Sequence, residues 1–236
     1  NFYGPMGLKT IGYHPLRRFD EDQVVPTEKD RWWRKQILHG FVHDESTAIF
    51  GGVGGQAGLF SNTRDLAVLM QMLINGGHYG GKRYFSKRTV KKFTSRHPNS
   101  HRGLGFDMQK PVPNPNRGMV CFSASATTFG HTGFTGTCAW ADPDNGVIFI
   151  FLSNRVYPDR KNQKINIYRV RQNVQQVVYN ALGLDMPPEG ICVPEEEADV
   201  LYAAQDSAIS DTLDDHLYDA DPEVVTQKDS VICTDC

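Results

Sequence analysis

The chain has 236 residues, of which 39% are hydrophobic and 22% are charged, an ordinary globular composition. Residues 1–183 hold 24 Lys/Arg and 12 Asp/Glu, a balance of +12, whereas residues 184–236 hold 1 and 15, a balance of −14. The basic residues are not clustered in a stripe, which argues against nucleic-acid binding. No apolar run approaches the roughly 20 residues of a membrane helix, so we expect no membrane span.

The first third of the chain is rich in turn-forming residues. Residues 1–23 combine Gly, Pro and aromatic residues without periodicity and predict a structured connection. Residues 26–30 predict a short helix with Thr27 as its N-cap. Trp32 and Trp33 are adjacent and cannot both face one core, so either one lines a groove or one is packed and the other half-exposed. Residues 51–58 hold five glycines, which predicts positive φ angles or a close approach to the backbone.

Apolar spacing predicts three helices. The first follows Ser61 as N-cap and ends at Gly76, and the second follows Ser86, with Val90 and Phe93 inward and a basic face in solvent. The third covers about residues 163–182 and ends at Gly183. Its apolar stripe, expected to pack against a sheet, consists of Ile167, Val170, Val174, Val177, Val178 and Ala181.

Strand patterns fill the segment between the second and third helices. Residues 103–108 and 118–122 predict one strand each, and 131–141 with 147–152 predict a hairpin joined by a tight turn at 142–146. The hairpin is expected in the middle of its sheet, with its second strand buried on both faces. Together these elements predict an α+β fold in which an antiparallel sheet is flanked by helices.

Neither histidine spacing nor cysteine spacing predicts a metal site. The pairs His39 and His43, and His97 and His101, are each four residues apart, but Gly40 and Pro98 interrupt the helix that such sites require. His43 and the two acids after it instead predict a polar loop that caps neighbouring backbone groups. The terminal C-x-x-C at 233–236 lacks a second ligand pair. We expect no metal and no cofactor.

Several motifs occur in the order found in one known superfamily. His131-Thr132-Gly133 resembles the Lys-Thr-Gly box of serine β-lactamases and penicillin-binding proteins, in the His-Thr-Gly form of class C-like β-lactamase-related serine hydrolases. Residues 5–10, 42–45, 51–61, 65–67 and 152–155 resemble the other landmarks of that branch. The resemblance covers about residues 1–183 and implies a β-lactamase-like, transpeptidase-like domain, with a periplasmic or extracellular location.

Two catalytic motifs of this superfamily are absent from the 236 residues. No serine is followed by a lysine three residues later, and no Tyr-x-Asn precedes the box. The resemblance therefore implies that residues 1–183 are the C-terminal portion of the domain and that the nucleophile lies on an upstream segment. Alone, this chain is expected to be inactive. Residues 184–236 are expected to be an acidic tail of low order.

The resemblance also implies specific substrate contacts. In the family a serine forms an acyl-enzyme with a small acyl substrate or cell-wall fragment, and the oxyanion is held by two backbone amides. Here the second amide is that of Phe134, while Thr132 bonds the substrate and Gly133 leaves room for it. His131 carries less charge near neutral pH than a lysine, which favours esters and other acyl compounds over carboxylates. Gln56 either contacts substrate or serves only the loop conformation.

One alternative class remains open at this point. The chain would then be a non-catalytic domain that binds acyl groups or peptidoglycan, or an accessory domain of a larger cell-wall hydrolase such as a β-N-acetylglucosaminidase fusion. No pair of carboxylates in the sequence argues for glycosidase chemistry within this chain.

Overall fold

The computed structural model describes residues 2–110 and 118–184. Residue contacts divide the chain into Asn1–Glu189 and Gly190–Cys236, and the second unit, with nearly all of the predicted tail, lies outside the described residues. The helices are α1 (Glu45–Ile49), α2 (Thr63–Ile74), α3 (Lys87–Thr94), α4 (Lys164–Ile167) and α5 (Val170–Ala181), with 3-10 turns at Gly4–Met6, Pro15–Arg17 and Glu21–Gln23. The strands are β1 (Lys29–Asp30), β2 (Gln36–Ile37), β3 (His78–Tyr79), β4 (Lys82–Arg83), β5 (Asp107–Met108), β6 (Phe129–Thr132), β7 (Cys138–Asp142) and β8 (Val147–Phe151).

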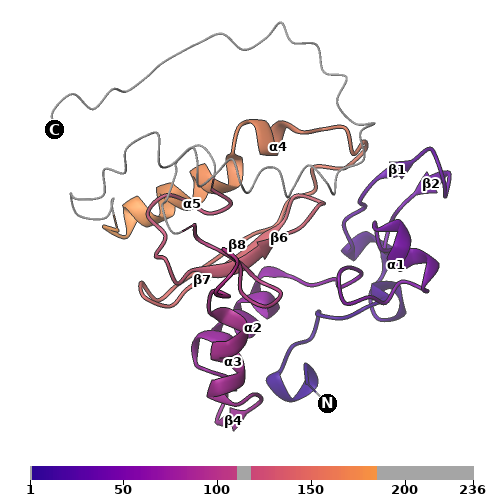
Figure 1. The fold of residues 1–236 in the computed structure, drawn as a ribbon. Coiled ribbons are helices and arrows are strands. Elements are labelled where there is room, and N and C mark those ends of the chain that lie inside the picture. The colour runs from indigo at the N-terminus through magenta and orange to yellow at the C-terminus, as the bar shows by residue number, and fades with distance from the viewer. Residues whose placement is uncertain (1, 111–117, 185–236) are drawn as a thin grey trace, which may run out of the picture. The chain divides into compact units, whose positions relative to one another are not determined.

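The main sheet is antiparallel, has the order β5-β6-β7-β8, and lies between α5 and α2 (Figure 1). Successive side chains of β7 point to opposite faces. Trp140 joins the core cluster that contains Tyr179 of α5, whereas Ala141 joins the cluster that contains Met70 of α2. Because helices cover both faces, the α+β prediction of an antiparallel sheet flanked by helices is confirmed.

The hairpin prediction is correct for its turn and wrong in two other respects. β7 and β8 pair through Asp142 and Val147 across the predicted turn. The predicted first strand is divided, because the segment between Thr132 and Cys138 turns back and makes β6 and β7 neighbouring strands. Within the described residues β8 is an edge strand, and only its Phe149 is fully buried. In the sheet formed by the described residues, its apolar run therefore lies at the edge and not in the middle.

The helix starts are close to the predicted ones. The N-cap of α2 is Asn62, whose side chain accepts from the Asp65 N–H, so the predicted cap Ser61 is wrong by one residue. Ser86 caps α3 as predicted, with Val90 buried, but Phe93 is 45% exposed rather than inward.

The predicted third helix is broken, and its buried face is not the apolar one. Arg169 takes a left-handed conformation (φ 49°) between α4 and α5. Val177 is 67% exposed, whereas Gln172, Gln175 and Tyr179 are buried. The buried amides bond the loop that precedes β6: Gln172 donates to the Gly118 carbonyl and Gln175 accepts from the Cys121 N–H. These tertiary hydrogen bonds outweigh the apolar stripe.

The same bonds explain why residues 118–122 form turns and bends rather than the predicted strand. The Cys121 N–H is bonded to Gln175, and its carbonyl accepts from the side chain of Gln109 at 2.9 Å. Side chains thus replace a strand partner for this backbone. Upstream, only Asp107–Met108 of the predicted strand at 103–108 is extended and paired.

The predicted helix at 26–30 is also wrong. Lys29–Asp30 forms β1 and pairs with β2. The Thr27 hydroxyl does not cap a helix but donates to the Leu38 carbonyl, and Asp30 accepts from the N–H groups of Trp32 and Trp33. The prediction of positive φ angles in the glycine-rich loop at 51–58 is confirmed, since Gly51, Gly52 and Gly58 have positive φ.

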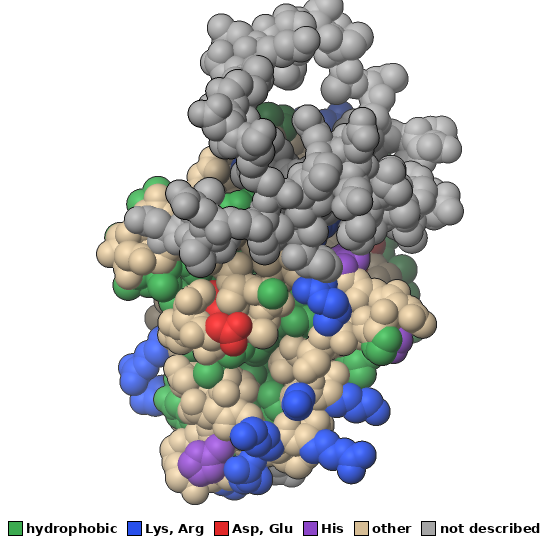
Figure 2. Space-filling view, turned by 60° about the vertical axis from the view of Figure 1, so that its left-hand side comes forward, with side chains coloured by type: hydrophobic (Ala, Val, Ile, Leu, Met, Phe, Trp, Pro, Cys, Tyr) green, Lys and Arg blue, Asp and Glu red, His purple; other side chains and the backbone are tan. Residues whose placement is uncertain are grey.

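The surface of the described part is strongly basic. Between Asp65 and Asp107 the sequence contains no acidic residue, and the Lys and Arg side chains of β4 and α3 are exposed. On the face shown in Figure 2, Lys and Arg side chains are far more common than Asp and Glu. None of the helices in residues 2–110 and 118–184 is both long and apolar enough to cross a membrane.

Candidate functional site

The end of β6 is an open strand edge. β5 pairs with Phe129 and Gly130, and its pairing ends there. His131 and Thr132 pair with β7 on one side, and no other described strand covers their second side. The His131 side chain is 50% exposed and Phe134 is 60% exposed. Residues 131–134 are therefore accessible to a ligand that lies along the strand.

His131 is held by its neighbours in one tautomer. Its Nδ1 lies 2.6 Å from the Thr132 carbonyl, which only accepts, so Nδ1 carries hydrogen. Nε2 lies 3.0 Å from Nη2 of Arg102, which only donates, so Nε2 accepts. Asp107 is 3.5 Å from Nε2, but its closer bond is to Nε of Arg102 at 3.0 Å.

Arg102 therefore brings a guanidinium, ion-paired with Asp107, to the first position of the box. Its side chain is 42% exposed, and its Nη1 has no bonded acceptor in the described part of the chain. Sequence reasoning missed this residue. It lies 29 positions before His131, and no motif connects the two.

A tight turn follows the strand and orients the Phe134 amide. The Gly133 N–H donates to the Thr137 carbonyl at 2.8 Å, and the Gly133 carbonyl accepts from the Gly136 N–H at 2.9 Å. In a trans peptide the N–H points opposite to the carbonyl. The Gly133 carbonyl points into the turn, so the Phe134 N–H points out of it. In residues 2–110 and 118–184 this N–H has no acceptor, and the Thr132 hydroxyl has no bonded partner.

Gln56 makes no hydrogen bond to this edge. Its amide donates to the Thr47 hydroxyl of α1 at 2.9 Å, and it has no bond to residues 131–134. Asp44 caps α1 by accepting from the Thr47 N–H, as the polar-loop prediction requires. The structure thus brings His131, Thr132, Gly133 and Phe134 together, whereas Gln56, in the glycine-rich loop, bonds α1.

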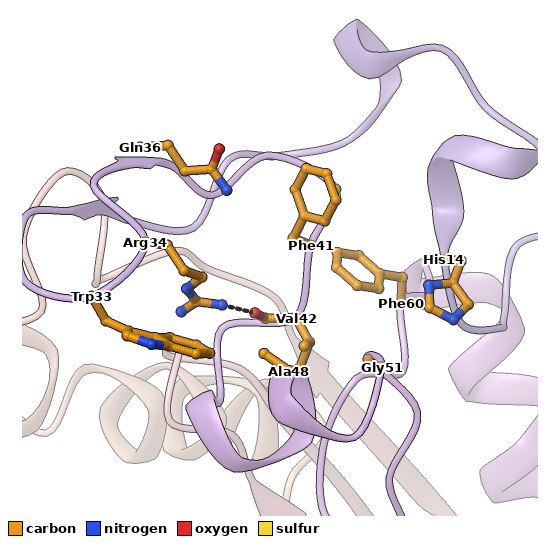
Figure 3. A pocket seen from close by; sticks show the side chains of 11 residues that line it. His14, Trp33, Arg34, Gln36, Phe41, Val42, Ala48, Gly51 and Phe60 are labelled. Atoms are coloured by element: carbon orange, nitrogen blue, oxygen red, sulfur yellow. Dashed lines mark hydrogen bonds between the residues drawn. The ribbon is translucent and has the colours of Figure 1, made fainter.

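An aromatic pocket of about 320 Å³ lies beside α1 (Figure 3). Trp33 and Arg34 are on one side of it, with Phe41, Phe60 and His14 on the other. Trp33 therefore lines a groove, as one of the two interpretations of the paired tryptophans required, and Trp32 is 79% exposed.

Arg34 is fully engaged in protein contacts. Its guanidinium bonds Asp30 and the carbonyls of Val42 and His43, at 3.0, 2.6 and 2.7 Å. It is therefore not available to bind an anion in the pocket.

The described residues contain no activated nucleophile of their own. Burial raises the pKa of Cys121 to about 12 and that of Cys138 to about 11, so both thiols stay protonated. The Ser125 hydroxyl donates to Asp142, and the Ser123 hydroxyl accepts from Gln176. Neither is bonded to a Lys or His. No group of three or more possible metal ligands occurs in the described ranges.

Comparison with known proteins gives consistent matches. The Beta-lactamase family matches residues 2–173. A Salmonella typhi protein named "Putative D-alanyl-D-alanine carboxypeptidase" is 39% identical over 178 residues, covering 70% of this chain and 40% of the relative. A protein of the same name from Salmonella newport (strain SL254) matches with the same identity and coverage. The chain thus spans about two fifths of the length of these curated relatives.

Two solved structures also match in part. A penicillin-binding protein homolog from Caulobacter crescentus has 29% identity and a TM-score of 0.34, over 42% of this chain and 27% of that one. A beta-lactamase from Mycobacterium bovis has 21% identity and a TM-score of 0.37, over 52% and 46%. Because the family match extends over most of the sequence, this chain belongs to the Beta-lactamase family, within the superfamily of serine β-lactamases and penicillin-binding proteins.

Proposed function

We propose that this chain forms the acyl-binding edge of a serine hydrolase that cleaves peptides or related acyl compounds ending in a carboxylate. The observation that carries the proposal is a row of donors without a bonded acceptor along the open edge of β6 in the described structure: Nη1 of Arg102, the Thr132 hydroxyl and the Phe134 N–H. The relatives' name, D-alanyl-D-alanine carboxypeptidase, supports a D-alanyl-D-alanine peptide as the substrate class.

Each donor has a distinct task in the proposed reaction. A serine oxygen attacks the substrate carbonyl, and the negative charge that develops on the carbonyl oxygen accepts the Phe134 N–H. The bond to the leaving amine or alcohol then breaks, leaving an acyl-enzyme that water hydrolyses to release the acid and restore the serine. Thr132 bonds the substrate, and Gly133 keeps the strand open beside it.

Arg102 changes the expectation drawn from the histidine of the box. An imidazole alone favours uncharged acyl compounds, but here a guanidinium lies beside it, bonded to His131 through Nη2 and to Asp107 through Nε, with Nη1 left for a ligand. We therefore place the substrate carboxylate at Arg102. This assignment favours carboxylate-terminated peptides over simple esters.

The nucleophile in this proposal comes from a Ser-x-x-Lys segment outside the 236 residues, because none of their serines has a lysine three residues later. The proposed site uses no metal or cofactor. We propose that the reaction takes place in the periplasm or outside the cell, which the carboxypeptidase name of the relatives supports. Gln56, which bonds Thr47 of α1, is proposed to support the glycine-rich loop and to contact a substrate that extends to it.

Labelling with a fluorescent penicillin tests the reaction type. We expect no covalent labelling of residues 1–236 alone, and stoichiometric labelling at the Ser-x-x-Lys serine of a longer polypeptide from the same gene. Labelling of the isolated chain would refute the assignment of the nucleophile. Binding of the peptide by the longer polypeptide without acylation would favour the alternative, a non-catalytic peptidoglycan-binding domain.

Hydrolysis by the longer polypeptide tests the role of Arg102. Arg102→Ala is expected to lower kcat/KM for a D-alanyl-D-alanine peptide about 10- to 100-fold, since a charge-assisted hydrogen bond contributes roughly 1.5–3 kcal/mol. The same change should leave a peptide with an amidated C-terminus nearly unaffected. Arg88→Ala, which removes an exposed arginine of α3, is the matched control. Equal losses on both substrates would refute the carboxylate assignment.

A further inference from the structure

The ring and the main chain of Phe134 are both held by neighbouring side chains. The His43 imidazole stacks on the Phe134 ring, with centroids 5.4 Å apart and planes at 28°. Arg155 places its Cζ 4.4 Å from the ring centroid and donates from Nε to the Phe134 carbonyl at 2.8 Å. An exposed turn residue with a glycine on its N-terminal side would otherwise move freely. These contacts restrict it.

His43 is in turn held by the buried carboxylate of Glu28, which is ion-paired with the partly exposed Arg160. Its Nε2 lies 2.7 Å from Oε2 of Glu28, and both side chains are buried. Arg160 donates from Nε to both oxygens of Glu28, at 2.8 and 2.9 Å, and its Nη2 lies 2.7 Å from Glu45. Burial alone would raise the pKa of Glu28, but the hydrogen bonds from Arg160 and His43 lower it overall. The carboxylate is therefore ionised, and the hydrogen shared with His43 sits on Nε2.

We infer that His43 is a positioning residue for the Phe134 amide. Glu28 and Arg160 hold the His43 ring, and that ring holds the Phe134 ring, so the Phe134 N–H keeps one direction. This role rests on the proposed function only in that the Phe134 N–H is taken to donate to the oxyanion. An ion pair between a buried carboxylate and a partly exposed guanidinium contributes little net stability compared with apolar packing. The pair is thus better accounted for by the orientation it imposes than by the stability it adds.

The hydrogen bond from the Gly136 N–H to the Gly133 carbonyl reports on this orientation, because that carbonyl shares a peptide plane with the Phe134 N–H. Hydrogen exchange of the Gly136 amide, measured by NMR on 15N-labelled chain, is the direct test. His43→Ala removes the stacked ring, and we expect Gly136 exchange to rise at least tenfold relative to the amides of β7 and β8. His43→Phe keeps a ring on Phe134, and we expect it to restore exchange to within about threefold of the wild type.

Two further variants separate positioning from general loosening. Glu28→Gln removes the charge that pairs with Arg160 but keeps an acceptor for His43. It should therefore raise the exchange rate of the Gly136 amide by a smaller factor than His43→Ala does. Asp65→Asn disturbs a different buried carboxylate, which accepts from the N–H groups of Thr10 and Ile11. It should change the exchange rate of the Gly136 amide only by the same factor as the exchange rates of the β7 and β8 amides. If His43→Ala raises the exchange rate of the Gly136 amide no more than Asp65→Asn does, the positioning role of His43 is overturned. A wild-type exchange rate of the Gly136 amide in Glu28→Gln would refute the role of Glu28 in holding the His43 ring.

Acylation of the longer polypeptide distinguishes this inference from the proposed function. With both correct, His43→Ala lowers the acylation rate constant at least tenfold and leaves KM within about threefold, and His43→Phe recovers most of the rate. Faster Gly136 exchange with an unchanged acylation rate would uphold the positioning role and refute the Phe134 amide as oxyanion donor.

Discussion

Two glycines of the His-Thr-Gly region, Gly130 and Gly133, are expected to differ in how much stability they lose on substitution by alanine. A Cβ at Gly130 would lie 2.6 Å from Cε3 and 2.8 Å from Cα of Trp140, and closer still to the Ala139 carbonyl. Two of these three contacts are with backbone of β7, so β6 and β7 would have to separate. A Cβ at Gly133 would meet mainly the Thr137 hydroxyl, which can rotate away.

The stability cost follows from which atoms can move. Overpacking against rigid neighbours costs typically 1–3 kcal/mol, and we expect Gly130→Ala to lie at about 3 kcal/mol. For a protein of this size each kcal/mol shifts Tm by roughly 2–4 °C, so Tm should fall by about 6–12 °C. Gly133→Ala should change Tm by less than about 2 °C, yet narrow the open strand edge and lower acylation of the longer polypeptide.

Thermal unfolding followed by far-UV circular dichroism provides the measurement. Gly133→Ala with Thr137→Ala serves as the matched control, because the smaller neighbour leaves full room for the added methyl group. Equal Tm shifts for Gly130→Ala and Gly133→Ala would refute the distinction between backbone and side-chain contacts. Unchanged acylation in a folded Gly133→Ala protein would refute the role of Gly133 in substrate access.

Three further predictions concern buried polar groups. Asp65→Ala removes the acceptor of the N–H and hydroxyl of Thr10, and we expect a loss of about 3 kcal/mol in urea unfolding, because buried donors are left unpaired; a loss under 1 kcal/mol would contradict this. Tyr179→Phe removes a 2.9 Å bond to Asp142 and should cost about 2 kcal/mol, less than Asp142→Ala, which frees several donors. Burial lowers the pKa of His43 below its usual 6.5, despite the opposing effect of its hydrogen bond to the Glu28 carboxylate. The unfolded chain therefore takes up this proton first, and the stability from neutral His43 is present above pH 6.5 and lost as pH falls through the lower folded-state pKa. His43→Phe should accordingly lose less stability than the wild type between pH 7 and pH 5, and equal slopes would argue against this.

Local signals in the sequence were sufficient for several elements. Ser86 lies one residue before α3, and the residues at 142–146 form the turn between β7 and β8. A cap or a tight turn depends on backbone geometry within four or five residues, so it can be predicted without the rest of the fold. The glycines of the 51–58 loop belong to the same class.

Predictions that depended on the face of an element were less successful. The apolar stripe of the third helix indicated Val177 as buried, but the buried residues include Gln172 and Gln175. Their amides are paired with the backbone of a loop more than 50 positions earlier. Nothing in the local pattern specifies that loop, because the pairing forms only when distant segments meet.

The sequence by itself determined the family, the missing Ser-x-x-Lys and the position of the His131-Thr132-Gly133 motif, since these depend on residue types in a fixed order. Tertiary structure alone decided what surrounds that strand. Arg102 reaches His131 across 29 positions, and His43 reaches Phe134 from another loop. Charge and ring contacts of this kind act through space over a few ångströms, so their partners are fixed by the folded path of the chain and not by spacing along it.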